Sequence, residues 1–82
     1  MDRNTEPGWH TETDATGLLC PLPVLKARRE LARMPPGAVL RLRATDPAVW
    51  VDIPHFCAEA GHALIEAIEQ NGEKVFLIRR GN

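Results

Sequence analysis

The residue with the clearest potential for chemistry is Cys20, which stands directly before Pro21 and close to Pro23. Proline is favoured in the first turn of a helix, because the N–H groups there have no acceptor within the helix. We therefore expect Cys20 at a helix N-terminus or one turn before it, where the helix dipole favours a thiolate over a thiol. Each proline removes one N–H that could bond to the sulfur, which leaves Leu22 as the donor between them. The sequence thus predicts a moderately activated thiol.

A thiolate in such a position can attack disulfides and persulfides through a linear arrangement of three sulfur atoms. Hydrolytic catalysis would need a partnered base and an oxyanion hole. The three histidines have no spacing from Cys20 that indicates such a base: His10, His55 and His62. A chain of 82 residues also has little room for a deep substrate pocket. The sequence favours a cysteine displayed at an edge for another protein's active site; the alternative is an unreactive cysteine before a helix cap.

The second cysteine, Cys57, lies in a short apolar stretch and is interpreted as a packed hydrophobic residue. The sequence has no C-x-x-C motif, which excludes a redox pair of the thioredoxin type and a four-cysteine zinc site. Gly61 is expected to end the helix between His55 and His62, and no carboxylate completes a site, so we expect no metal. We expect no other cofactor. A redox switch between Cys20 and Cys57 is a further alternative, and it needs the two Cα atoms within about 7 Å of each other.

The helix that follows Cys20 is the best-defined element of the sequence. Its apolar residues recur at spacings of three and four: Val24, Ala27, Leu31 and Met34. The Pro-Pro-Gly sequence at 35–37 ends the helix. Its first residue is expected to be Pro21 or Pro23, since Pro23 disfavours helical angles at the residue before it.

Strands are expected before this helix, after it and at the end of the chain. Residues 11–15 can form an edge strand, and residues 38–45 alternate in the way typical of a half-buried strand with one wet face. Residues 62–70 fit either a helix or a strand by spacing alone. The Asn-Gly pair at 71–72, between two apolar runs, favours a β-hairpin with residues 75–78.

A second helix is expected within residues 48–60. Proline is tolerated in a first helical turn but costs about 3 kcal/mol deeper inside a helix. Pro54 therefore predicts that the main helix begins near Asp52, whose side chain can cap it. Gly61 is expected to end this helix in a left-handed conformation.

This order of elements, β-α-β-α-β-β, predicts an α/β fold of the two-layer sandwich type. The first two strands should be parallel and joined by a right-handed crossover, and the last two should be antiparallel. Two helices can cover only one face of a four-stranded mixed sheet, which leaves the arginines of residues 38–45 on the open face. We expect residues 1–10 to be a mobile N-terminal arm, with Trp9 covering the rim of the core, and residues 11–82 to be a single domain.

Composition excludes several classes of protein. Hydrophobic residues make up 44% of the chain, as in ordinary globular domains. Ten basic residues stand against 11 acidic ones, whereas a duplex-binding protein needs a basic excess, so we expect no direct contact with nucleic acid. No apolar run reaches the length of about 18 residues that a membrane span needs, and the N-terminal residues lack the apolar core of a signal peptide. We expect a soluble cytoplasmic protein with no membrane contact.

The segment around Cys20 carries the pattern D-x-x-G-x-x-C-P-x-P, formed by Asp14, Gly17, Cys20, Pro21 and Pro23. This pattern resembles the signature of the TusA/SirA-like sulfur-carrier family. The likeness continues through short pieces at 34–37, 46–47, 52–54, 56–57, 61–62 and 77–81. It thus covers residues 13–81, and the later pieces place the chain closer to TusA than to the more distant members.

The resemblance implies a β-α-β-α-β-β fold in which Cys20 accepts sulfane sulfur as a persulfide. The usual donor in the family is a cysteine desulfurase, which contains pyridoxal phosphate, and the acceptor is a downstream sulfur-relay protein. In TusA the sulfur reaches 2-thiouridine in tRNA, which we take as the leading expectation, whereas relatives supply molybdenum-cofactor assembly or sulfur oxidation. We expect a monomeric sulfurtransferase that acts within a relay. The alternative from a different class is a regulatory or adaptor module in which Cys20 is structural.

The other candidate site residues each have a structural alternative. Asp14 can orient Cys20, but an aspartate at this position is first a turn-former. Gly17 is expected to supply a positive φ angle. Trp50 stands where the family pattern has a small or polar residue, and is either a core residue or an exposed anchor. Three basic residues are expected to form a solvated face that can steer an acidic partner: Lys26, Arg28 and Arg29.

Overall fold

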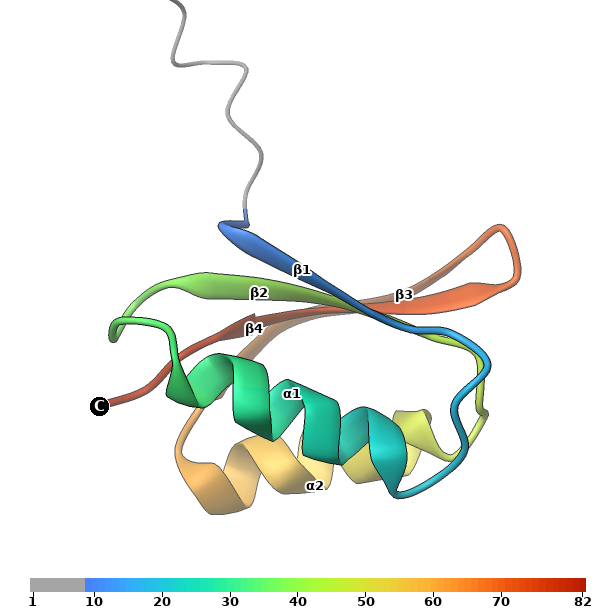
Figure 1. Ribbon diagram of the computed structural model, residues 1–82, viewed down its shortest axis with the longest axis horizontal. Helices are drawn as coiled ribbons and strands as arrows, with labels where there is room; N and C mark the ends of the chain where they lie inside the picture. The colour runs from blue at the N-terminus through green and yellow to red at the C-terminus, as the bar shows by residue number, and fades with distance from the viewer. Residues whose placement is uncertain (1–8) are drawn as a thin grey trace, which may run out of the picture.

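The protein is an α/β two-layer sandwich, seen in a computed structural model that describes residues 9–82. Its elements follow the predicted order: β1 (Thr11–Ala15), α1 (Leu22–Ala32), β2 (Val39–Ala44), α2 (Val49–Ala60), β3 (Ala63–Gln70) and β4 (Glu73–Arg79). Figure 1 shows the four strands as one layer and both helices against one face of it. Within residues 9–82, no helix has the length and apolar character to cross a membrane.

The sheet has the strand order β1-β2-β4-β3. β1 runs parallel to β2 and β3 runs antiparallel to β4, as predicted, and β4 also runs antiparallel to β2. Asn71 and Gly72 have φ angles of 53° and 81°, the pair of positive values that a two-residue hairpin turn requires. Because β1 and β2 are parallel, the chain leaves both strands at the same edge of the sheet. The segments after Ala15 and Ala44 therefore start side by side, and the candidate site lies there.

The core lies between the sheet and the two helices. β2 contributes Leu40 and Leu42, β4 contributes Phe76 and Ile78, and all four side chains are fully buried. Burying a side chain of this size stabilises the fold by about 1.5–3 kcal/mol. The predicted alternation of β2 is confirmed, since its two leucines face the helices and its two arginines are only partly buried.

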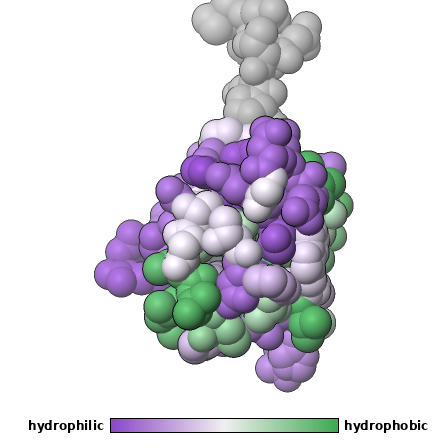
Figure 2. Space-filling model, turned by 90° about the vertical axis from the view of Figure 1, so that its right-hand side faces the viewer, coloured by the Kyte–Doolittle hydropathy of each residue, from purple (hydrophilic) through white to green (hydrophobic). Residues whose placement is uncertain are grey.

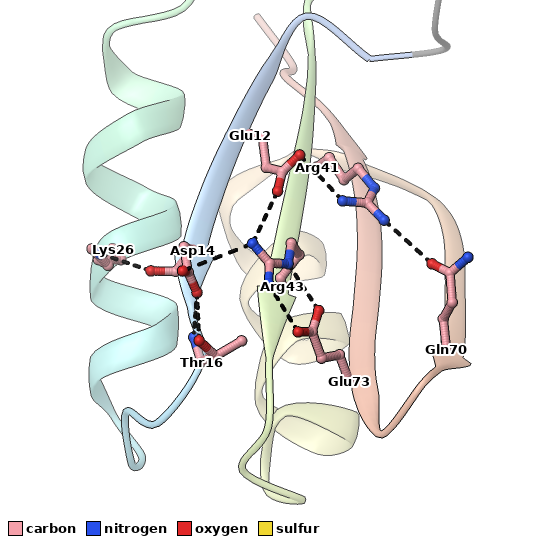
Figure 3. Close-up of polar contacts among 8 residues, drawn as sticks. All are labelled: Glu12, Asp14, Thr16, Lys26, Arg41, Arg43, Gln70 and Glu73. Atoms are coloured by element: carbon pink, nitrogen blue, oxygen red, sulfur yellow. Dashed lines mark hydrogen bonds and ion pairs between the residues drawn. The ribbon is translucent and has the colours of Figure 1, made fainter.

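The open face of the sheet is lined by ion pairs between strands (Figure 3). The Arg43 guanidinium donates two hydrogen bonds of 2.8 Å to the Glu73 carboxylate and a third, of 3.2 Å, to Glu12. Arg41 pairs with Glu12 at 3.2 Å and donates to Gln70 at 3.3 Å. Arg41 and Arg43, predicted on the wet face, thus connect β2 to β1 and β4 through ion pairs.

The expected N-terminal arm lies mostly outside the described residues, at 1–8. Two residues that were assigned to it lie against the sheet. The His10 N–H donates to the Val39 carbonyl at 2.7 Å, and His10 Nδ1 accepts from the Val39 N–H at 3.0 Å. The Arg41 guanidinium lies 6.0 Å from the centre of the Trp9 ring, so Trp9 covers the open face of the sheet and not the rim of the core.

Helix α1 begins at Leu22, so the prediction of Pro21 or Pro23 as its first residue is wrong by one position. The Pro21 carbonyl accepts the first helical hydrogen bond, from the Leu25 N–H at 3.1 Å. Pro21 is therefore the N-cap residue and Pro23 the second helical residue. Both positions tolerate a missing N–H, because the first turn of a helix has no internal acceptors.

Helix α2 begins at Val49, so the prediction that it begins near Asp52 is wrong. The Asp46 carboxylate accepts a hydrogen bond of 3.1 Å from the Ala48 N–H, in the turn that leads into the helix. Pro54 then lies inside the helix, where it removes one hydrogen bond from an element held by its buried residues. The early start frees the Asp52 side chain from a capping role. Gly61 ends the helix with a φ angle of 80°, as predicted.

Candidate active site

Cys20 lies in the β1–α1 connection, at the edge where the two parallel strands end, and its side chain is exposed. The Cys20 N–H donates a hydrogen bond of 2.6 Å to the Asp46 carboxylate. Nearby, the Gly17 N–H donates to the Thr45 hydroxyl at 2.9 Å. These two bonds fasten the connection after β1 to the connection after β2. The backbone of Cys20 is thus held in place while its side chain faces solvent.

The Cys20 thiol is paired with a carboxylate. Its Sγ donates a hydrogen bond of 2.9 Å to Asp52 Oδ2. This hydrogen bond is the main reason why the pKa of the Cys20 thiol is raised, with smaller contributions from desolvation and from the charges of Asp52 and Asp46. The expectation of a moderately activated thiol is therefore wrong for the free protein. The Leu22 N–H, expected as a donor to the sulfur, bonds instead to the Leu19 carbonyl at 2.8 Å.

A groove of about 500 Å³ opens beside Cys20, between α1 and α2. Helix α1 contributes Val24 and Arg28 to it, and α2 contributes Asp52, Phe56 and Glu59 among others. The Arg28 guanidinium lies 5.4 Å from the centre of the Phe56 ring. The groove therefore combines apolar walls with charged groups of both signs.

Apolar side chains are exposed around the start of α1. The exposed fraction is 69% for Leu19 and 47% for both Leu22 and Leu25. A shallow depression of about 380 Å³ lies among Leu18, Leu22, Leu25, Lys26 and Arg29. Figure 2 looks onto the end of the molecule that carries the β1–α1 connection, and shows apolar groups gathered beside polar ones. Exposed apolar groups around a reactive atom suit contact with another protein.

The aspartate of the motif acts as a turn-former. The Asp14 carboxylate accepts hydrogen bonds from the Thr16 N–H at 2.9 Å and from the Thr16 hydroxyl at 2.6 Å (Figure 3). It also lies 3.8 Å from Arg43, so its charge is directed to the open face of the sheet and not to Cys20. These contacts lower the pKa of the Asp14 carboxyl, led by the bond from the Thr16 hydroxyl.

The glycine and the prolines of the motif shape the backbone around Cys20. Gly17 has a φ angle of 81°, as predicted, and a Cβ atom there would meet no neighbour within 4 Å, so the need for glycine is conformational. Pro21 lines the groove, and the Cys20–Pro21 peptide bond is cis. Pro23, in the first turn of α1, is fully buried. The motif thus brings Cys20 and Pro21 to the surface of the groove and uses the other residues to fix the turn.

The three basic residues expected on a common surface lie in different places. Arg28 lines the groove, whereas Lys26 and Arg29 line the depression beside the exposed leucines. Lys26 Nζ donates to the Asp14 carbonyl at 2.9 Å, which ties α1 to the end of β1 (Figure 3). Only Arg28 shares the groove with Cys20.

Two residues that contact Cys20, Asp46 and Asp52, were not identified as site residues from the sequence. Asp46 follows β2 as Cys20 follows β1, and the parallel pairing of these strands was predicted. That topology is a signal that could have placed the Asp46 carboxylate beside the cysteine. Asp52 had no such signal, because its position depends on the start of α2.

Cys57 and His62 have structural roles, whereas His55 lines the groove. Cys57 is 2% exposed in the core, and burial raises its pKa to about 11, which confirms the interpretation as a packed residue. Both cysteines are free thiols. His62 Nδ1 accepts a hydrogen bond of 2.9 Å from the Gly81 N–H, and His55 lies 3.7 Å from Glu59. Among residues 9–82, no group of three His, Cys, Asp or Glu side chains is placed to hold a metal ion.

Trp50 is both a packing residue and a surface residue. The exposed fraction of its side chain is 37%. The centre of its ring lies 5.4 Å from that of Phe76, with the two planes tilted by 58°, a favourable arrangement for aromatic rings. One part of the indole therefore extends the core, and the other part is available at the surface of α2.

The chain is similar to known proteins over nearly its whole described length. A family model described as sulfurtransferase TusA matches residues 11–80. The sulfur carrier protein TusA of Pseudomonas fluorescens is 42% identical over 69 residues, which are 84% of this chain and 83% of that protein. A putative sulfur carrier protein of Neisseria meningitidis serogroup A is 49% identical over 59 residues, or 72% and 80% of the two chains.

The fold is likewise found in a solved structure. The crystal structure of a SirA-like protein from Desulfitobacterium hafniense superposes with a TM-score of 0.78 at 25% sequence identity, covering 89% of this chain and 100% of that one. The match of the family model runs from the start of β1 to just beyond β4, and therefore includes Cys20 with every element that holds it. On these grounds the chain belongs to the TusA family of sulfurtransferases.

Proposed function

We propose that this protein is a sulfur carrier in which Cys20 accepts a sulfane sulfur as a persulfide and yields it to a second protein. The observation that carries the proposal is the placement of Cys20: an exposed thiol on a fixed backbone, between a groove and a set of exposed leucines. A partner protein can reach such a sulfur directly. The names of the similar proteins from Pseudomonas fluorescens and Neisseria meningitidis support the same role.

The proposed transfer balances without an oxidant or a reductant. During loading, the Cys20 sulfur gives up its proton and attacks the outer sulfur of a cysteine persulfide on the donor. A new S–S bond forms at Cys20, the S–S bond of the donor breaks, and the donor cysteine leaves as a thiolate that takes a proton. During unloading, the thiolate of an acceptor attacks the outer sulfur in the same way, and Cys20 is the leaving thiolate.

For the partners, we propose a cysteine desulfurase as donor and a downstream sulfur-relay protein as acceptor, with 2-thiouridine in tRNA as the leading destination. Molybdenum-cofactor assembly and sulfur oxidation are the alternative destinations. Delivery through a protein is supported by the two arginines of β2. Both form ion pairs with carboxylates, and Arg41 also donates a hydrogen bond to Gln70, so neither guanidinium is free to bind a phosphate backbone. We place this monomeric carrier in the cytoplasm, where free thiols persist.

The test is to incubate the protein with a cysteine desulfurase and cysteine and to record its mass. We expect an added mass of one sulfur atom that a reductant removes. The Cys20→Ala variant should not gain it, whereas Cys57→Ala, which removes the buried thiol, should gain it as the wild type does. An adduct on Cys20→Ala, or none on the wild type, would contradict the proposal.

The adaptor alternative is favoured by the exposed leucines around α1, which could bind a partner without any sulfur chemistry. It makes a different prediction for the isosteric variant Cys20→Ser. An adaptor keeps full function in cells with serine at this position, whereas a sulfur carrier loses it. Complementation of a strain that lacks the protein separates the two functions.

A further inference from the structure

The hydrogen bond between Cys20 and Asp52 joins the reacting atom to a carboxylate on another element. The sulfur lies in the β1–α1 connection and the carboxylate on the first turn of α2, with 2.9 Å between Sγ and Oδ2. Both side chains line the groove between the helices. The proton on the sulfur is therefore held at the surface where a partner would reach Cys20.

The charged groups around this contact come from four elements. Asp46 approaches from the β2–α2 connection; it accepts the Cys20 and Ala48 N–H groups, which lower the pKa of the Asp46 carboxyl and keep it ionised. The charge of Lys74 on β4 also favours the ionised form of Asp46. The remaining groups line the groove: Arg28 on α1, and Asp52, His55 and Glu59 on α2. Among residues 9–82, the carboxylate that hydrogen-bonds to the sulfur is that of Asp52.

A carboxylate can accept this bond only from a sulfur that carries a proton. If Cys20 ionises, the S–H bond is lost and two negative charges face each other about 3 Å apart, which is unfavourable near a protein surface. If Cys20 carries a persulfide, its inner sulfur has no hydrogen and cannot donate. The contact seen in the structure therefore belongs to one state, the empty carrier with a neutral thiol.

We propose that Asp52 is a positioning residue that holds the empty Cys20 as a neutral thiol through the contact of 2.9 Å in the groove. This inference rests on the proposed function and adds a means of regulating the reactivity of Cys20. In the free protein the sulfur is exposed but weakly nucleophilic, since the thiolate is the attacking species. On loading, the contact is lost, so Asp52 also distinguishes the empty carrier from the loaded one.

The test is the rate at which iodoacetamide alkylates Cys20 in the full chain between about pH 6 and pH 10, the range in which thiols titrate. Peptide mapping by mass spectrometry separates Cys20 from the buried Cys57. For Asp52→Asn we expect an alkylation rate at pH 7 that is about three- to tenfold higher than in the wild type, because a hydrogen bond from the thiol to a charged acceptor is lost. The midpoint of the pH profile should move to lower pH, and the rates at high pH should converge.

The matched control is Glu59→Gln, which removes a carboxylate from the same groove without touching the sulfur. Its profile should superimpose on that of the wild type. Asp52→Ala serves as a second variant, and it should shift the profile in the same direction as Asp52→Asn. Circular dichroism of each variant confirms that the fold compared is the same.

Three results would overturn the inference. The Asp52→Asn profile could coincide with that of the wild type, or Glu59→Gln could move it as far. A higher rate at every pH with an unchanged midpoint would show that Asp52 only limits access to the sulfur. The desulfurase experiment on the wild type is independent of these outcomes. A wild type that takes up sulfur, together with coincident profiles, would reject the role of Asp52 alone, whereas a wild type that takes up no sulfur would reject the proposed function.

Discussion

Cys20 and Cys57 are both held as thiols, but for different physical reasons. For Cys20 the main cause is the hydrogen bond to Asp52, a contact between exposed groups. For Cys57 the cause is burial, which nothing short of unfolding relieves. Cys20 is therefore accessible at the surface, whereas Cys57 is a part of the core.

The burial of Cys57 makes the stability of the protein depend on alkaline pH. Its pKa is about 11 in the folded protein against 9.0 for a free thiol, so the unfolded chain loses its proton first as the pH rises. The contribution to the free energy of unfolding is complete below about pH 9 and declines by up to about 2 kcal/mol as the pH approaches 11. Urea denaturation at several pH values measures this decline. The Cys57→Ala variant should show a shallower one, and parallel curves for the two proteins would refute the assignment.

At the level of residues, the motif around Cys20 identified the exposed thiol and the glycine with positive φ. It could not identify Asp52, because a residue 32 positions away becomes a neighbour only through the packing of α2. The sign of the pKa shift was wrong for the same reason. The prediction considered the dipole of one helix, whereas the sulfur responds first to a carboxylate on the other helix.

At the level of elements, the ends of the helices fix the geometry of the groove. Helix α2 ends at Gly61, whose φ angle of 80° lets the His62 N–H bond to the Cys57 carbonyl at 2.9 Å. A Cβ atom at Gly61 would meet no neighbour within 4 Å. The requirement at this position is thus a left-handed backbone and not space.

Gly61→Ala is therefore expected to lower the free energy of unfolding by about 1 kcal/mol, because a left-handed alanine is strained. Asparagine tolerates this conformation better, so Gly61→Asn should cost less. Thermal denaturation of the two variants measures the difference. Equal stability of Gly61→Ala and the wild type would show that the turn does not depend on glycine.

The predicted start of helix α2 was wrong. Because proline is favoured in a first helical turn, the predicted start of α2 lay too close to Pro54. In the structure, the Asp46 side chain accepts a hydrogen bond from the Ala48 N–H in the turn before the helix. The buried residues of the helix hold it in spite of the hydrogen bond that Pro54 removes. Local propensity was outweighed by tertiary packing, which the sequence does not display.

At the level of the whole molecule, the two-layer architecture divides the surface by function. The open face of the sheet carries ion pairs between strands (Figure 3). The opposite layer carries Cys20, the groove and the exposed leucines. The order of the elements along the chain and the one-sided helices followed from alternation, helical spacing and the Asn-Gly turn. The placement of Lys26 and Arg28 on two sides of α1 could also be predicted from the sequence. With 3.6 residues per turn, two residues that are two positions apart point to nearly opposite sides of a helix.

This arrangement predicts that the leucines around Cys20 contribute to docking. Replacing Leu19 and Leu25 together by serine should slow sulfur loading from a desulfurase several-fold, because exposed apolar contacts with the partner are lost. The rate of alkylation of Cys20 should not change. The matched control is Val51→Ser, which alters a residue of α2 that is 71% exposed. Loading that is as fast in the double variant as in the wild type would exclude these leucines from the docking surface.

The most direct test of the account follows labelled sulfur through the protein. Cysteine with an isotopically labelled sulfur atom is supplied to a cysteine desulfurase together with the carrier, and the carrier is then isolated and mixed with an acceptor thiol. We predict that the label appears on Cys20, leaves with the acceptor, and is bound by Cys57→Ala but not by Cys20→Ala. Label that stays on the carrier in the presence of the acceptor, or that is bound equally by Cys20→Ala, would contradict the role of Cys20 as a sulfur carrier.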